Sequence, residues 1–78
     1  MIDRKRVGER LIELRDIDNR TLESAAMMIG IHENTLASYE HGKRLPSPDR
    51  MVLIADYYDQ PVEELFFSYR KNEVIKSE

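Results

Sequence analysis

The sequence contains no cysteine and no tryptophan, and its 78 residues include only three glycines and three prolines. Without cysteine the chain has neither a disulfide nor a thiolate metal site, so packing has to stabilise the fold. The absence of cysteine also fits a reducing cytoplasm, where we expect the protein to be located. Few glycines and prolines, together with 41% hydrophobic residues, predict one small folded domain rather than a disordered chain.

Long apolar runs are also missing. No apolar run is longer than that from Ala25 to Ile29, which is far shorter than the roughly 20 residues that a membrane-spanning helix needs. The first residues, Met-Ile-Asp-Arg-Lys-Arg, have no apolar stretch behind their charges, so we expect no secretion signal. We therefore predict a protein without a membrane partner.

The residue types and spacings that catalysis requires are absent as well. There is no Ser/His/Asp arrangement, no phosphate-cradling glycine loop and no nucleophilic cysteine. The two histidines, His32 and His41, have no cysteine nearby, so we expect no metal site. We predict a binding protein rather than an enzyme, with no cofactor and no small-molecule substrate.

The charge is mildly acidic but unevenly distributed. Twelve basic and fifteen acidic residues give a net charge of −3, which by itself does not favour nucleic acid. Basic residues nevertheless gather within residues 1–20 and again at Lys43, Arg44 and Arg50, whereas residues 51–69 contain acids and no base. A local basic patch, rather than the net charge, is what nucleic-acid binding requires.

The spacing of apolar residues is helical throughout and predicts an all-α fold. Val7, Leu11 and Leu14 recur along one side of a first helix that Asp3 can cap. Asn19 is a suitable left-handed residue to end it. A second helix is expected between an N-cap at residue 21, which is threonine, and residue 30, a glycine that can adopt a positive φ.

Three more helices are expected after this turn. The third runs from about residue 32 or 33 to residue 40, and the fourth opens with Ser47 as N-cap and Pro48 at its first position. Because the fourth is apolar over most of its circumference, we predict it to be the most buried helix. A short fifth helix completes a domain of residues 1–69, before a polar tail at 70–78. We expect the core to include the methionines at positions 27, 28 and 51.

The middle of the chain has the pattern of a helix-turn-helix. Ala26 is small where a second helix crosses, Gly30 follows in a tight turn, and the apolar Ile31 and Leu36 come next. The following helix then has one polar face that the core does not use. That face contains Glu33, Asn34, Ala37 and Ser38, flanked by Thr35 and His41.

The chain resembles a known family over residues 6–67. The resemblance rests on the residues of this turn and of the following helix, together with the stretch from Tyr39 to Arg44, Pro46 and the closing segment 62–66. This family is the lambda-repressor-like, XRE-family helix-turn-helix domain of bacterial and phage transcriptional regulators. The resemblance implies a compact five-helix DNA-binding domain whose helix-turn-helix consists of the second and third helices. It also implies a structural ion pair between Arg15 and Glu40.

The resemblance further implies that double-stranded DNA is the partner, bound by a homodimer on a palindromic operator with the third helix in the major groove. The implied base-facing residues are Glu33, Asn34 and Ser38, and His32 and Thr35 lie near the backbone. The implied phosphate contacts come from His41, Lys43 and Arg44. The expected function is a sequence-specific regulator that represses by occupying a promoter.

Three apolar residues, Leu22, Phe67 and Tyr69, exceed the needs of one small core. The fifth helix is therefore the predicted dimer surface, formed by Val62, Leu65, Phe66, Phe67 and Tyr69. The alternative is that the tail folds back over this surface. A second hypothesis is a protein-interaction module, antitoxin-like or a co-regulator, that keeps the fold and binds a regulatory protein through the fifth helix. The acidic stretch at 51–69 and the absence of Lys and Arg from the third helix favour this hypothesis.

Overall fold

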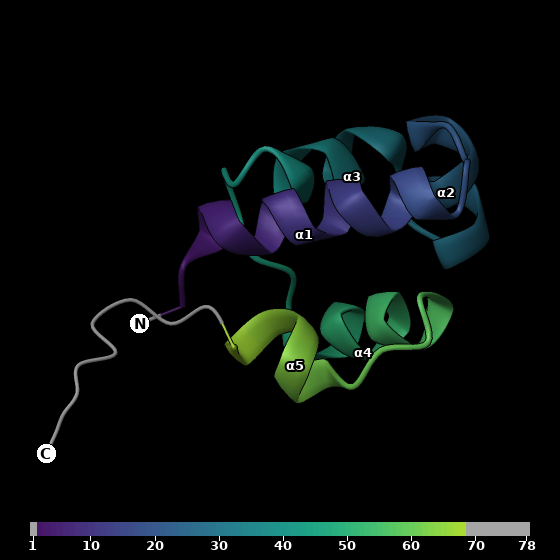
Figure 1. Ribbon diagram of the computed structural model, residues 1–78. Helices are drawn as coiled ribbons and strands as arrows, with labels where there is room; N and C mark the ends of the chain where they lie inside the picture. Colours follow the sequence, from purple (N-terminus) through teal and green to yellow (C-terminus); the bar gives the residue numbers. More distant parts are fainter. Residues whose placement is uncertain (1, 69–78) are drawn as a thin grey trace, which may run out of the picture.

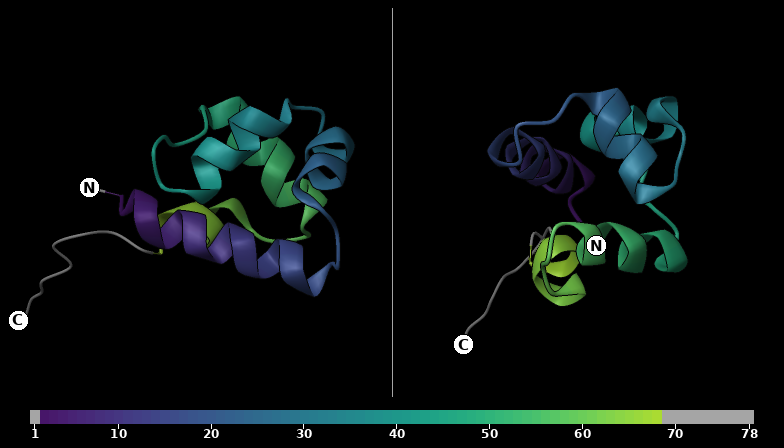
Figure 2. Two further views of the ribbon diagram at one scale, coloured as in Figure 1. Left: turned by 90° about the horizontal axis from the view of Figure 1, so that it is seen from above. Right: turned by 90° about the vertical axis from the view of Figure 1, so that its right-hand side faces the viewer.

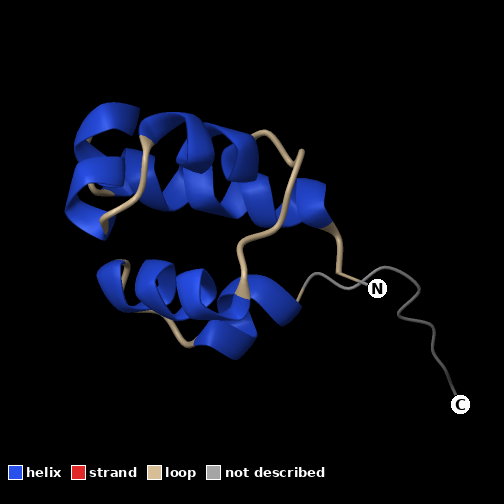
Figure 3. Cartoon of the chain, turned by 180° about the vertical axis from the view of Figure 1, so that it is seen from behind, coloured by secondary structure: helices blue, strands red, loops and turns tan. Residues whose placement is uncertain are grey.

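The computed structural model describes residues 2–68, which form five helices connected by short turns (Figure 1). They are α1 (Arg4–Ile17), α2 (Leu22–Ile29), α3 (Glu33–Glu40), α4 (Pro48–Tyr57) and α5 (Val62–Phe67). No strand occurs in this part of the chain (Figure 3), so the predicted all-α class is confirmed. No helix within residues 2–68 combines the length and apolarity needed to cross a bilayer. Tyr69 and the predicted tail at 70–78 lie outside the described residues.

Helices α1, α2 and α4 begin where the sequence places side-chain hydrogen-bond acceptors for their first amides. The Asp3 carboxylate accepts from the amides of Lys5 and Arg6 at 3.1 and 3.3 Å. The Thr21 hydroxyl accepts from the Ser24 amide at 3.0 Å, and Ser47 caps α4 in the same way. All three predicted N-caps are therefore confirmed.

Two residues with positive φ shape the turns before and after α2. Asn19, after the end of α1, has a φ of 58°, as predicted. Gly30, with a φ of 98°, ends α2, and its amide donates to the Ala26 carbonyl at 2.8 Å. The amide of Ile31 donates to the same carbonyl at 3.0 Å, which closes the turn before α3.

The core lies between two layers, with α1, α2 and α3 above and α4 and α5 below (Figures 1 and 2). The α1 helix packs mainly against α3, and α4 packs against α5 and α2. The predicted stripe of Val7, Leu11 and Leu14 is buried on the inner side of α1. Leu36, Ile54, Leu65 and Phe66 fill the core from the other elements.

The predicted burial of two helices was wrong in part. Val52 on α4 is 49% exposed, because this helix forms an edge of the lower layer and buries only the side with Met51, Ile54 and Ala55. The expectation that α4 is the most buried helix is therefore incorrect. Met28 and Met27, the latter 71% exposed, are not core residues either. The small and branched residues of α2, Ala25, Ala26 and Ile29, fill the inner side instead.

The predicted dimer surface on α5 also needs correction. Leu65 and Phe66 are 1% and 0% exposed, because the side of α5 that carries them closes the core of the same chain. These two side chains are therefore unavailable to a second copy. Val62 and Phe67 are half-buried and pack at the edge of the core.

Gly8 in the middle of α1 is a structural feature that the sequence analysis did not identify. A β-carbon at Gly8 would overlap the carbonyl oxygen of Glu40 and would lie 2.8 Å from that of Tyr39. The absence of a side chain therefore lets α1 and the end of α3 approach each other along their backbones.

Candidate nucleic-acid interface

The α3 helix starts at a histidine cap. His32 Nδ1 accepts a hydrogen bond from the Asn34 amide at 3.0 Å. An accepting Nδ1 carries no proton, so the ring proton of neutral His32 is on Nε2. Because His32 is exposed, this Nε2–H is available as a donor at the start of α3.

The inner side of α3 packs on α1 and α2 through Leu36, Tyr39 and Glu40, which are buried. As a result the opposite side faces solvent, and Glu33 and Asn34 are exposed there. Within residues 2–68 the Asn34 side chain has no hydrogen-bond partner, so its amide retains both a donor and an acceptor. This is the combination that reads the N6 and N7 edge of adenine.

Ser38 has less hydrogen-bonding capacity than Asn34. Its hydroxyl donates to the Thr35 carbonyl at 2.7 Å, and both residues are half-buried. With its one proton used inside the helix, Ser38 offers an outside partner lone pairs only. The predicted base-facing residues therefore lie on one side of α3, but they differ in what they can recognise.

The loop after α3 carries exposed bases. The amide of Lys43 donates to the Ser38 carbonyl at 2.9 Å, which folds the loop back on the end of the helix. The Arg44 guanidinium lies 5.6 Å from the centre of the Tyr39 ring, a cation–π contact. His41, Lys43 and Arg44 are all exposed, so the predicted phosphate contacts lie on one accessible edge.

The expected ion pair between Arg15 and Glu40 is present and has two hydrogen bonds. Nε donates to Oε2 at 2.8 Å and Nη2 donates to Oε1 at 3.1 Å. The Glu40 side chain is only 3% exposed, and its hydrogen bond with Arg15 raises the pKa of that guanidinium. The pair therefore fixes the end of α3 to α1 and positions the loop that follows.

Two tyrosines near this pair have raised pKa values. Burial raises the pKa of Tyr58 to about 12, and its hydroxyl has no hydrogen-bond partner among the described residues. Burial and a 2.8 Å hydrogen bond to Asp18 raise the pKa of Tyr57. Both lie at the carboxyl end of α4, near the end of α1, rather than on the exposed side of α3.

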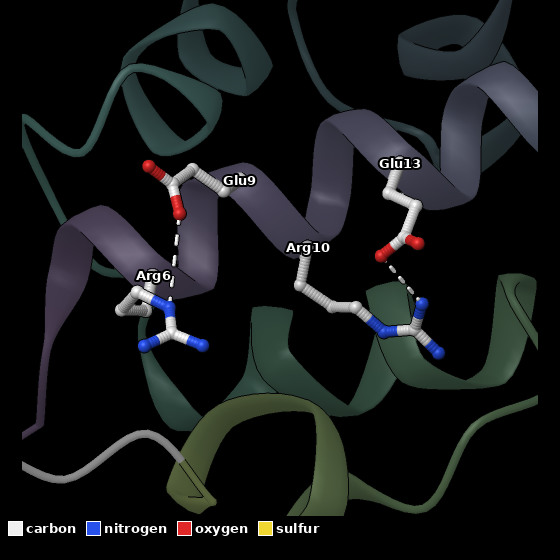
Figure 4. A pocket seen from close by; sticks show the side chains of 4 residues that line it. All are labelled: Arg6, Glu9, Arg10 and Glu13. Carbon is white, nitrogen blue, oxygen red and sulfur yellow. Dashed lines mark hydrogen bonds and ion pairs between the residues drawn. The ribbon is translucent and has the colours of Figure 1, made fainter.

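Three other arginines have partners within the chain, either a hydroxyl group or a carboxylate. Arg50, which the sequence grouped with Lys43 and Arg44, donates to the Tyr39 hydroxyl at 3.1 Å and so connects α4 with α3. On α1, Arg6 pairs with Glu9 and Arg10 with Glu13, around a shallow hollow (Figure 4). These arginines are neutralised locally by a neighbouring carboxylate.

Arg4 has a contact that sequence analysis missed. Its Nη1 donates to the Lys43 carbonyl at 3.3 Å, across 39 positions of the sequence. No spacing in the sequence indicates this contact, because the packing of α1 on α3 creates it. Among the described residues there is no group of three or more His, Asp or Glu side chains that could hold a metal ion.

Comparison with known proteins identifies relatives of this arrangement. The profile of the helix-turn-helix family matches residues 11–65. Over 57 residues the chain is 40% identical to the HTH-type transcriptional regulator AnsR of Bacillus subtilis, a match that covers 73% of this chain. The same match covers 49% of AnsR, so the chain spans about half the length of that relative.

Two solved structures have the same fold. The restriction-modification controller protein C.AhdI from Aeromonas hydrophila superposes with a TM-score of 0.74 at 30% identity, over 82% of this chain and 93% of that one. The DNA-binding domain of BldD from S. venezulae gives 0.71 at 27% identity, over 82% and 96%. Since the family match covers more than half of the residues of this chain, the chain belongs to the XRE-type helix-turn-helix family.

Proposed function

We propose that this protein is a sequence-specific transcriptional regulator that binds double-stranded DNA with α3 in the major groove. The observation that carries the proposal is the exposed side of α3, where the side-chain amide of Asn34 has no hydrogen-bond partner within residues 2–68. The exposed basic residues Lys43 and Arg44 follow in the loop after this helix. Affinity for phosphate and discrimination between bases require these two kinds of group. The relatives support the proposal, since one is named a transcriptional regulator and another a DNA-binding domain.

Each part of the surface has a distinct role in the proposed complex. Asn34 reads adenine, and Glu33 and Ser38 accept hydrogen bonds from base amino groups such as that of cytosine. His32, through Nε2–H, and Thr35 lie beside the DNA backbone. The exposed residues after the helix contact phosphates: His41, Lys43 and Arg44.

In the proposed mechanism a cytoplasmic homodimer binds a palindromic operator and represses by blocking the promoter. Two-fold symmetry places the two copies of α3 in successive major grooves on one side of the duplex. On α5 the accessible apolar residues for dimer contact are Val62 and Phe67, since Leu65 and Phe66 belong to the core. Light scattering across a concentration series tests the dimer independently of DNA.

Selection of bound duplexes from a random pool, at near-physiological salt, tests the function. The expected result is an enriched inverted repeat with half-sites about 10 base pairs apart. N34A/S38A should then remove discrimination between the selected and a scrambled duplex, whereas K43A/R44A should weaken binding to both. A D56A variant, altered at an exposed site on α4, is the control and should bind as the unmodified chain does.

The competing function is a protein-interaction module, itself antitoxin-like or a co-regulator, that keeps the fold and binds a regulatory protein. It is favoured by the absence of any Lys or Arg from α3 and by the exposed Glu33 in its first turn. A folded protein that enriches no duplex above background would support this alternative and contradict DNA recognition. In that case N34A/S38A should leave partner binding unchanged.

A further inference from the structure

The start of α1 and the loop after α3 form one continuous part of the surface. Gly42 has a φ of 73°, and a side chain there would come within 3.0 Å of the Lys5 α-carbon. Beside this contact, Arg4 Nη1 donates to the Lys43 carbonyl at 3.3 Å. Two segments that are far apart in the sequence therefore meet at this edge of the upper layer (Figure 1).

Four basic side chains gather at this junction, which we call the basic edge: Arg4, Lys5, Lys43 and Arg44. All four are exposed, and within residues 2–68 none of them forms an ion pair with a carboxylate. The neighbouring Asp3 carboxylate accepts hydrogen bonds from backbone amides at the start of α1. Asp3 offsets at most one of these four charges, so the basic edge keeps a net positive charge.

The next arginines of α1 are different. Arg6 lies 3.7 Å from Glu9, and Arg10 lies 2.8 Å from Glu13, each one turn along the helix (Figure 4). These pairs cancel charge locally, so only the first turn of α1 contributes to an uncompensated positive surface. This contrast provides a charge-matched comparison within one helix.

The basic edge is also well placed relative to α3. It lies beyond the carboxyl end of the helix, whereas Asn34 is in the first turn. Eight helical residues span about 12 Å, which is close to the width of the major groove. When α3 lies in the groove, a surface at its far end faces the phosphates of the groove wall.

We propose that Arg4 and Lys5 of α1 bind DNA phosphates together with Lys43 and Arg44, an inference that rests on the proposed function. The first turn of α1 is thus part of the DNA-binding surface, and its contacts are independent of base sequence. Each phosphate contact releases counterions, so each contributes about 0.9 to the slope of log affinity against log salt.

The test compares R4A/K5A with the charge-matched control R6A/R10A. Each variant loses two positive charges from α1, so long-range effects of net charge are equal. Positive side chains in the first turn of a helix interact unfavourably with the helix dipole, and alanine has a high helix propensity. The R4A/K5A variant should therefore stay folded. Circular dichroism checks the fold, and fluorescence anisotropy with a mixed-sequence duplex gives affinity across a salt series.

We expect R4A/K5A to reduce the salt slope by about two and R6A/R10A to change it much less. Equal slopes for the two variants would overturn the role of the first turn of α1. If K43A/R44A reduces the slope and R4A/K5A does not, the proposed function stands and this inference fails. If the unmodified chain binds no duplex even at low salt, both fail.

Discussion

Gly8 lies directly against the carbonyl of Glu40, so that the backbone of α1 touches the backbone at the end of α3. Glycine in a helix interior costs about 1 kcal/mol relative to alanine, so local propensity does not explain its presence. The close contact does explain it, because any side chain would push apart the two helices that present the candidate interface.

We therefore expect G8A to destabilise the fold despite the better helix propensity of alanine. The neighbouring atoms are backbone carbonyls that cannot rotate away, and overpacking of this kind costs about 1–3 kcal/mol. Urea denaturation followed by circular dichroism measures the change. E9A, one position along on the exposed side, should change stability by no more than about 0.5 kcal/mol. An equal effect of both variants would contradict the steric explanation.

The Arg15–Glu40 pair gives a second prediction for stability. R15M leaves the Glu40 carboxylate buried without its partner, and we expect a loss of about 2–3 kcal/mol. The double variant R15M/E40L, which buries no charge, should lose less than R15M or E40L loses alone. Denaturation of all four proteins completes a double-mutant cycle. If the double variant equals the sum of the two single changes, the side chains are not energetically coupled.

Tyr58 predicts how stability depends on alkaline pH. Its pKa rises from 10.0 to about 12 on folding, so in this range the folded chain binds more protons than the unfolded chain. Stability should therefore fall as pH rises from 10 to 12, and Y58F should reduce that fall. At pH 7 we expect Y58F to cost nothing, because the hydroxyl has no partner among the described residues.

Y57F is the control for this experiment. Tyr57 donates to Asp18 at 2.8 Å, so its phenylalanine variant loses a hydrogen bond and about 0.5–1.5 kcal/mol at pH 7. Thermal unfolding of both variants at pH 7 and at pH 10–11 separates the two effects. A larger loss for Y58F than for Y57F at pH 7 would show that the Tyr58 hydroxyl has a partner.

The proposed base contacts predict unequal effects for Asn34 and Ser38. The free amide of Asn34 can form two hydrogen bonds with adenine, so N34A should cost about 1–3 kcal/mol of discrimination on the selected operator. S38A should cost less than N34A, because its proton already bonds to the Thr35 carbonyl. Competition binding with single-base operator variants measures both. A larger effect of S38A would reverse this ranking.

Much of the secondary structure could be predicted from the sequence because its causes are local. Asp3, Thr21 and Ser47 accept hydrogen bonds from amides two or three residues later, and Asn19 and Gly30 adopt left-handed conformations within single turns. Such interactions depend on residues that are close in the chain. The polar residues of α3 and the bases after it are also consecutive, so the candidate site was largely visible in the sequence.

The sequence by itself thus determined the five helices, their caps and the family, whereas the tertiary structure decided which apolar faces are buried. Methionine and valine suit a core, yet Met27 and Val52 are exposed because no helix within residues 2–68 covers their sides of α2 and α4. Packing of α1 on α3 likewise creates the Gly8 contact and brings Arg4 to Lys43. Contacts between distant segments depend on how whole helices pack, and that information is not present in any local stretch of sequence.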